Sequence, residues 1–151
     1  MLFRSRTEFD EGFARFSPDG QWVAYDSNES GRYEVYVRPF SPDGAAGVGK
    51  WPVSTGGGEQ PHWRGDGKEL FYLQGDRKLM AAEVKTTGGG RFEAGIPKAL
   101  FSTKAARGPV GLNAAYAVTA DGQHFLIIRE GQEPVWQPAT VVVNWTAGLK
   151  K

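Results

Sequence analysis

Three copies of one passage constrain the fold of this chain more than any other feature of its sequence. Each copy is an apolar strand-like run, an Asp-Gly pair and a second apolar run. The copies are residues 13–25, 61–72 and 116–128. Their Asp-Gly pairs begin at Asp19, Asp66 and Asp121, about 50 residues apart. Self-similarity at such a period is typical of propellers and solenoids, whose units bury their faces against neighbouring units.

The copies extend beyond these two runs. Third strand-like segments follow at Tyr33–Phe40, Lys78–Val84 and Thr140–Trp145, and fourth ones at Trp51–Thr55 and Ala99–Thr103. No segment keeps a helical period. Leu2–Ser5 resembles the fourth segments and precedes the first copy as they precede the next. The sequence therefore predicts one all-β domain over residues 1–151, a β-propeller of three four-stranded blades at about 12–55, 59–103 and 113–146.

The Asp-Gly pairs predict two-residue hairpin turns. A type I′ turn needs positive φ at both central residues, and Asp-Gly tolerates this. The three aspartates are also potential metal ligands, but their recurrence at one place in every copy favours turn chemistry. The second runs are almost continuously apolar, which predicts that neighbouring blades cover both faces of each blade.

Composition excludes several classes of protein. There are 18 basic and 17 acidic residues, giving a net charge of +1, so the chain lacks the basic footprint of a nucleic-acid or anionic-membrane binder. It has no cysteine, which removes disulfides, thiolate metal sites and cysteine nucleophiles. The apolar runs are too short to span a bilayer, and the first residues lack the apolar core of a signal peptide. These features leave the location unknown, with the cytoplasm as the default.

A resemblance to a known family is carried by three stretches. They are Phe-Ser-Pro-Asp-Gly-Gln-Trp-Val-Ala-Tyr at 16–25, Val-Ser-Thr-Gly-Gly-Gly at 53–58, and Pro-His-Trp-Arg-Gly-Asp-Gly-Lys-Glu-Leu-Phe-Tyr at 61–72. The chain resembles TolB-type, WD-repeat-like β-propellers, and is most similar to the C-terminal blades of propellers attached to bacterial serine/threonine kinases. The resemblance implies a bacterial propeller and is compatible with a periplasmic location. The motifs of a kinase are missing, so kinase activity is not implied.

Three blades are fewer than a propeller ring contains. Rings normally have four to eight blades, so this chain would form roughly half of a six-bladed ring. A half ring leaves apolar blade faces and a strand edge uncovered. We expect two chains to join head to tail as a homodimer, with Leu2–Ser5 of one chain completing the last blade of the other. A second interpretation is that the remaining blades lie upstream in a longer chain.

Polar residues in the loops at one end of the blades form the candidate site, because loops usually carry the function of a propeller. The candidates for ligand binding are Glu11, Asn28, Arg32, Glu59, His62, Arg77 and Asn113. A solvated polar surface is the competing interpretation. His62 lies on a predicted innermost strand, where a hydrogen-bonded histidine is more frequent than a functional one. Glu11 and Glu59, doubled by a dimer, could hold a divalent cation in the channel. We expect no other cofactor.

The leading functional prediction is a non-catalytic binding or scaffold module that recognises a protein, a peptide or a small polar ligand at the channel mouth. It rests on repeats without a catalytic constellation, and a propeller fold alone does not define a function. One alternative is a hydrolase or lyase with a metal or His62 at the channel mouth. Another is a ligand-sensing fragment of a larger signalling protein.

Overall fold

The described part of the chain is made of β-strands and connecting loops. The structure, a computed structural model, describes residues 8–41, 49–87, 90–105, 114–129 and 140–143. The strands are β1 (Glu11–Phe16), β2 (Trp22–Ser27), β3 (Glu34–Pro39), β4 (Trp51–Pro52), β5 (Glu59–Trp63), β6 (Glu69–Leu73), β7 (Lys78–Thr87), β8 (Arg91–Ala94), β9 (Lys98–Ser102), β10 (Tyr116–Val118), β11 (His124–Ile127) and β12 (Thr140–Val143). These ranges contain no helix, so the all-β prediction is confirmed for them.

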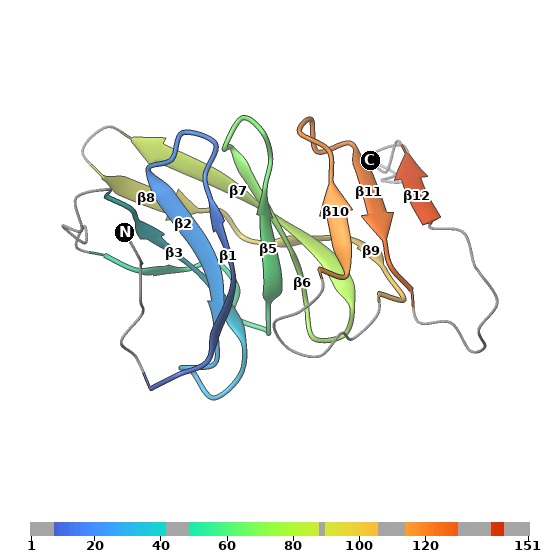
Figure 1. Ribbon diagram of the computed structural model, residues 1–151, viewed down its shortest axis with the longest axis horizontal. Helices are drawn as coiled ribbons and strands as arrows, with labels where there is room; N and C mark the ends of the chain where they lie inside the picture. The colour runs from blue at the N-terminus through green and yellow to red at the C-terminus, as the bar shows by residue number, and fades with distance from the viewer. Residues whose placement is uncertain (1–7, 42–48, 88–89, 106–113, 130–139, 144–151) are drawn as a thin grey trace.

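The strands form three antiparallel sheets that lie side by side in a row (Figure 1). The first sheet has the order β1-β2-β3-β4, and the second β5-β6-β7-β8, with β9 also paired to β7. The third has the order β10-β11-β12. Consecutive strands pair with each other, which is the up-and-down arrangement of propeller blades. The first three strand-like segments of every copy are therefore strands, as the sequence predicted.

The outermost strands differ among the sheets. In the first sheet β4 pairs with β3 only at Trp51 and Pro52, so it is shorter than predicted. In the second sheet β9 occupies the fourth place and pairs with the first half of β7. The expected completing segment, Leu2–Ser5, lies outside the described residues, and the pairing of β12 with a partner chain stays a prediction.

The Asp-Gly turns have one conformation, but it is not the predicted type I′. In the first turn the Gly20 N–H donates to the Ser17 carbonyl at 2.8 Å, and the Ser17 N–H donates to the Trp22 carbonyl at 2.9 Å. Four residues therefore separate the two strands. Gly20 has φ +70°, whereas Asp19 is not among the residues with positive φ. Because a type I′ turn needs left-handed geometry at both positions, the two-residue prediction was wrong.

The aspartates of these turns accept hydrogen bonds from their own loops. The Oδ1 atoms of Asp19, Asp66 and Asp121 accept the N–H of the residue two positions later, at 3.0, 3.0 and 2.9 Å. This is the side-chain turn that aspartate forms readily. The prediction that these residues serve turn chemistry is confirmed.

Side chains of the central sheet point alternately to its two neighbours. Leu70 and Tyr72 of β6 belong to the core between the first and second sheets. Phe71 and Leu73 belong to the core between the second and third. Both faces of β6 are therefore buried, which explains its continuous apolar sequence and confirms the expectation for this strand.

The strand β8 was not predicted. It forms a hairpin with the far half of β7, where Val84–Thr87 pair with Arg91–Ala94, and it contacts β4 of the first sheet. Its Phe92 ring lies 5.3, 5.8 and 6.5 Å from the rings of Trp22, Trp51 and Trp63. The β7–β8 hairpin thus joins the second sheet to the first through an aromatic cluster, which we define as these four residues.

Within the described ranges, no helix is long and apolar enough to cross a membrane.

Candidate functional site

A buried hydrogen-bond network connects all three sheets near the start of their inner strands. The Asp26 carboxylate, on β2, accepts the N–H of Gln60, on β5, at 2.8 Å. The Gln60 side-chain oxygen accepts the Ala115 N–H at 2.7 Å, and its carbonyl accepts the Tyr116 hydroxyl at 2.9 Å. Gln60 therefore holds the first sheet with its backbone N–H, and the third sheet with its side-chain oxygen and its backbone carbonyl.

Local backbone geometry makes this network possible. Gln60 has φ +57°, and the pairing of β5 with β6 shifts register between Glu59 and His62. Phe13, at the same place in the first copy, has φ +46° beside a similar shift. A bulge re-aims the groups of its strand, so the repeated bulge turns Gln60 out of the ladder of its own sheet.

Burial governs the protonation of the groups in the network. Asp26 is 2% exposed, and burial raises its pKa to about 6, with the charge of Glu59 adding to the rise. The N–H donors of Gln60 and Gly12 act in the opposite direction on the same pKa. Burial also raises the pKa of Tyr116 well above its ordinary value, which keeps its hydroxyl a hydrogen-bond donor.

His62 is held beside this network. Its Nδ1 lies 3.2 Å from the Gln60 carbonyl oxygen, and its ring lies 4.6 Å from the Tyr116 ring. Burial lowers the pKa of His62, and the nearby Arg15 charge acts in the same direction. A neutral imidazole at pH 7 can donate through Nδ1 to that carbonyl and keep Nε2 as an acceptor. The arrangement is compatible with a positioning role, and no nucleophile is bonded to the ring within the described residues.

The other predicted site residues enter separate local structures. Asn28 is bonded to Asp10, whose N–H donates to the Asn28 side-chain oxygen at 3.0 Å. Glu11 begins β1 and lies opposite Ser27, the residue after Asp26. Glu59 begins β5, and its charge raises the pKa of Asp26. Arg77 lies in the turn from β6 to β7 with φ +65°, and its carbonyl accepts the Thr103 N–H at 2.8 Å.

Asn113 lies outside the described residues. The single ligand pocket proposed for these side chains stays a prediction.

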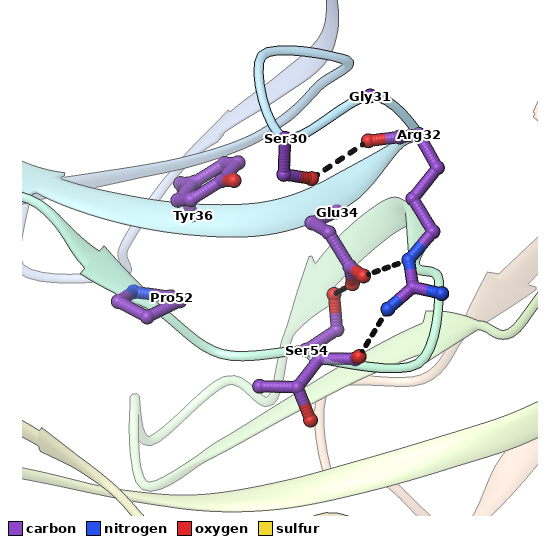
Figure 2. A pocket seen from close by; sticks show the side chains of 8 residues that line it. Ser30, Gly31, Arg32, Glu34, Tyr36, Pro52 and Ser54 are labelled. Carbon is purple, nitrogen blue, oxygen red and sulfur yellow. Dashed lines mark hydrogen bonds and ion pairs between the residues drawn. The ribbon is translucent and has the colours of Figure 1, made fainter.

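Arg32 forms one wall of a cleft of about 410 Å³ on the outward side of the first sheet (Figure 2). Its Nε donates to the buried Glu34 carboxylate at 2.7 Å, and its Nη2 donates to the Thr55 carbonyl at 2.5 Å. Glu34 also accepts the Ser54 hydroxyl and the Gly57 N–H. The carboxylate is therefore fully engaged in tying β3 to the loop after β4, as a buried charge requires.

Asp26, which is central to the inter-sheet network, was not among the predicted site residues. A signal existed for Asp26, since the equivalent positions of the other copies are the apolar Leu73 and Ile128. Within the described ranges, no group of three or more histidine, aspartate and glutamate side chains could hold a metal ion.

Of the comparisons with known proteins, the one with solved structures gives a likeness. No family model matches the chain. No curated protein matches it either. Among solved structures, the crystal structure of TolB from Acinetobacter baumannii superposes with a TM-score of 0.49 and 20% sequence identity. The match covers 81% of this chain and 27% of the TolB chain. The chain thus spans about a quarter of the length of TolB, a β-propeller protein.

Proposed function

We propose that this chain is half of a six-bladed β-propeller, completed by a second copy, and that it works as a non-catalytic binding or scaffold module. The proposal extends the row of three blade-like sheets to a closed ring. It keeps the expectation that Leu2–Ser5 of one chain adds to the edge of β12 in the other.

The open ends of the row carry this proposal. On β11, Phe125 and Ile127 point into the core against the second sheet. Leu126 and Ile128 alternate with them and are 40% and 51% exposed. At the other end of the row Phe16 is also exposed. Apolar side chains at the outward face of a terminal sheet favour cover by another sheet.

The first and third sheets do not cover each other. Each apolar core joins the second sheet to one neighbour, and in the described part of the chain no hydrogen bond or ring contact joins the first sheet to the third. A ring therefore needs blades from outside these three sheets. A second copy supplies them with two equivalent junctions, as a two-fold axis requires.

A binding role fits the way the polar groups are used. Asp26, Gln60 and Glu34 are engaged in holding strands and sheets together, and His62 is held against Tyr116. Such a scaffold leaves the loops and the clefts between sheets as the surfaces for recognition.

The mass of the particle tests ring closure. We expect light scattering during size-exclusion chromatography to give twice the chain mass of 16.5 kDa at micromolar concentration. A chain lacking its first six residues should dissociate or melt earlier, because the last blade would lose a strand. A stable monomer, or a truncated chain that assembles and melts like the parent, contradicts the proposal.

Metal analysis tests the non-catalytic part. Protein purified without a chelator is expected to contain less than a stoichiometric amount of any divalent cation, by inductively coupled plasma mass spectrometry. One bound cation per chain or per dimer would instead favour the enzyme with a metal in the channel.

A further inference from the structure

A second cleft, of about 650 Å³, opens between the Asp-Gly turns of the first two sheets and the far half of β7. Trp22, Trp63 and Val84 contribute to its lining, and the same residues belong to the core between these sheets or pack against it. Gly65 and Gly67 of the second turn line another side. The cleft thus has an apolar floor and a wall with little side-chain bulk.

One side of this cleft is an unpaired strand edge. Pairing of β6 with β7 stops where Glu69 lies opposite Glu83, and the Val84 N–H still donates to the Lys68 carbonyl at 2.8 Å. Beyond Val84, β7 continues to Thr87 with β8 on its other side only, as far as the described residues go. Backbone groups of alternate residues point to the same side of a strand. The N–H and C=O of Thr86 therefore point to the same side of β7 as those of Val84. At the level of Thr86, β6 has ended and no described strand lies on that side.

The rim of the cleft carries two lysines and two aspartates. Lys68 and Lys85 are exposed, and neither forms an ion pair within the described residues. Asp66 is compensated by Arg64, whose Nε lies 2.7 Å from its Oδ1. The Asp19 carboxylate accepts the Ser17 hydroxyl and the Gln21 N–H of its own turn. Both aspartates are thus engaged by groups of their own turns, whereas the two lysine side chains have no hydrogen bond or ion pair within the described residues and can meet an acidic ligand.

We propose that this cleft binds an extended acidic peptide segment of a partner protein, which adds as a short strand to the edge of β7 at Thr86. Strand addition uses free backbone groups for affinity and side-chain pockets for selectivity. The inference deepens the proposed binding role, but it uses only the first and second sheets and does not depend on ring closure.

Strand alternation defines the peptide further. Val84 and Thr86 share one face of β7, and Lys85 points to the other. Residues directly opposite on paired strands share a face. A peptide that alternates valine with glutamate therefore places valine beside Val84 and Thr86, toward the tryptophan floor, and glutamate beside Lys85. Acidic side chains also complement Lys68 at the end of the edge.

Fluorescence anisotropy with a labelled seven-residue peptide of alternating glutamate and valine tests this inference on the full chain. We expect saturable binding that weakens about tenfold or more in the variant Lys68→Glu/Lys85→Glu. The variant Thr86→Pro should weaken binding about fivefold, because it removes one backbone donor. Proline is tolerated at such an unpaired position of an edge. Lys98→Glu/Lys104→Glu, the same change of charge at two exposed lysines outside the cleft, is the matched control and should bind like the wild type.

Three results would overturn the inference: no binding by the folded wild type up to millimolar peptide, equal binding by the peptide with lysine in place of glutamate, or unchanged binding by both cleft variants. Thermal melting of each variant checks that it is folded. A monomer that binds the peptide would contradict ring closure and leave the cleft site intact. A dimer that does not bind the peptide would contradict the cleft site and leave ring closure intact.

Discussion

Replacing Phe92 with alanine is expected to lower the free energy of unfolding by about 3–5 kcal/mol, the range measured when a buried phenylalanine is truncated. Phe92 is 2% exposed and is the residue of β8 that meets Trp22, Trp51 and Trp63. These rings come from both the first and the second sheets, so the vacated volume lies between two sheets. Neither sheet can collapse into it without moving the other, which places the expected loss at the upper part of the range.

Urea unfolding followed by tryptophan fluorescence measures this effect. Ile96→Ala is the matched control, because Ile96 follows β8 closely in sequence but is 88% exposed, and its truncation should change stability by less than about 0.5 kcal/mol. Phe92→Leu should recover part of the loss, since it refills part of the volume. If Phe92→Ala and Ile96→Ala were equally mild, the aromatic cluster would not be holding the two sheets together.

The repeats predicted the strands that every copy shares, but not β8. Repeat alignment identifies positions by their counterparts, and Phe92 has none among the described residues, where only the second copy has a hairpin like β7–β8. The signal in the sequence is local: Gly88, Gly89 and Gly90 interrupt two short segments with strand-forming residues. Such a signal gives a hairpin, but not the fact that it reaches the first sheet.

The inter-sheet network was beyond sequence reasoning for a different reason. Gln60 bonds to Asp26 and Ala115 because a bulge turns its backbone to positive φ. Glutamine is not a residue that predicts such a conformation, unlike glycine or asparagine. The residues that Gln60 meets also depend on how far one sheet is shifted against the next. No pattern within a single strand encodes that shift. The turn type failed similarly, since Asp-Gly is compatible with more than one hairpin geometry.

The contribution of Asp26 to the stability of the protein is expected to rise as the pH falls from 7 to about 4. Its pKa is raised from 3.8 to about 6 in the folded protein, because burial penalises the carboxylate more than its N–H donors stabilise it. The folded state therefore binds the proton more tightly than the unfolded state. The contribution is fully present below pH 3.8 and is lost as the pH rises through 6. A shift of this size corresponds to about 3 kcal/mol.

A comparison with Asp26→Asn isolates this contribution, because His62, whose pKa is lowered, and Glu69, whose pKa is raised, add their own pH dependence to both proteins. We expect the free energy of unfolding of the wild type minus that of the variant to increase by about 2 kcal/mol from pH 7 to pH 4, which is most of the full contribution reached below pH 3.8. Urea unfolding at one protein concentration gives the values, since assembly would otherwise shift apparent stability.

Asp121→Asn provides a control of opposite sign. The Thr119 hydroxyl and the Gln123 N–H lower the pKa of Asp121, so its contribution is present above the unfolded pKa of 3.8 and is lost as the pH falls below that value. The wild-type advantage over Asp121→Asn should therefore shrink in acid, while the advantage over Asp26→Asn grows. Parallel behaviour of the two differences would mean that Asp26 is not buried against Gln60. The first and second sheets would then be held by their shared apolar core, which includes the aromatic cluster, and by the Trp63 indole N–H, which donates to the Arg15 carbonyl at 3.0 Å.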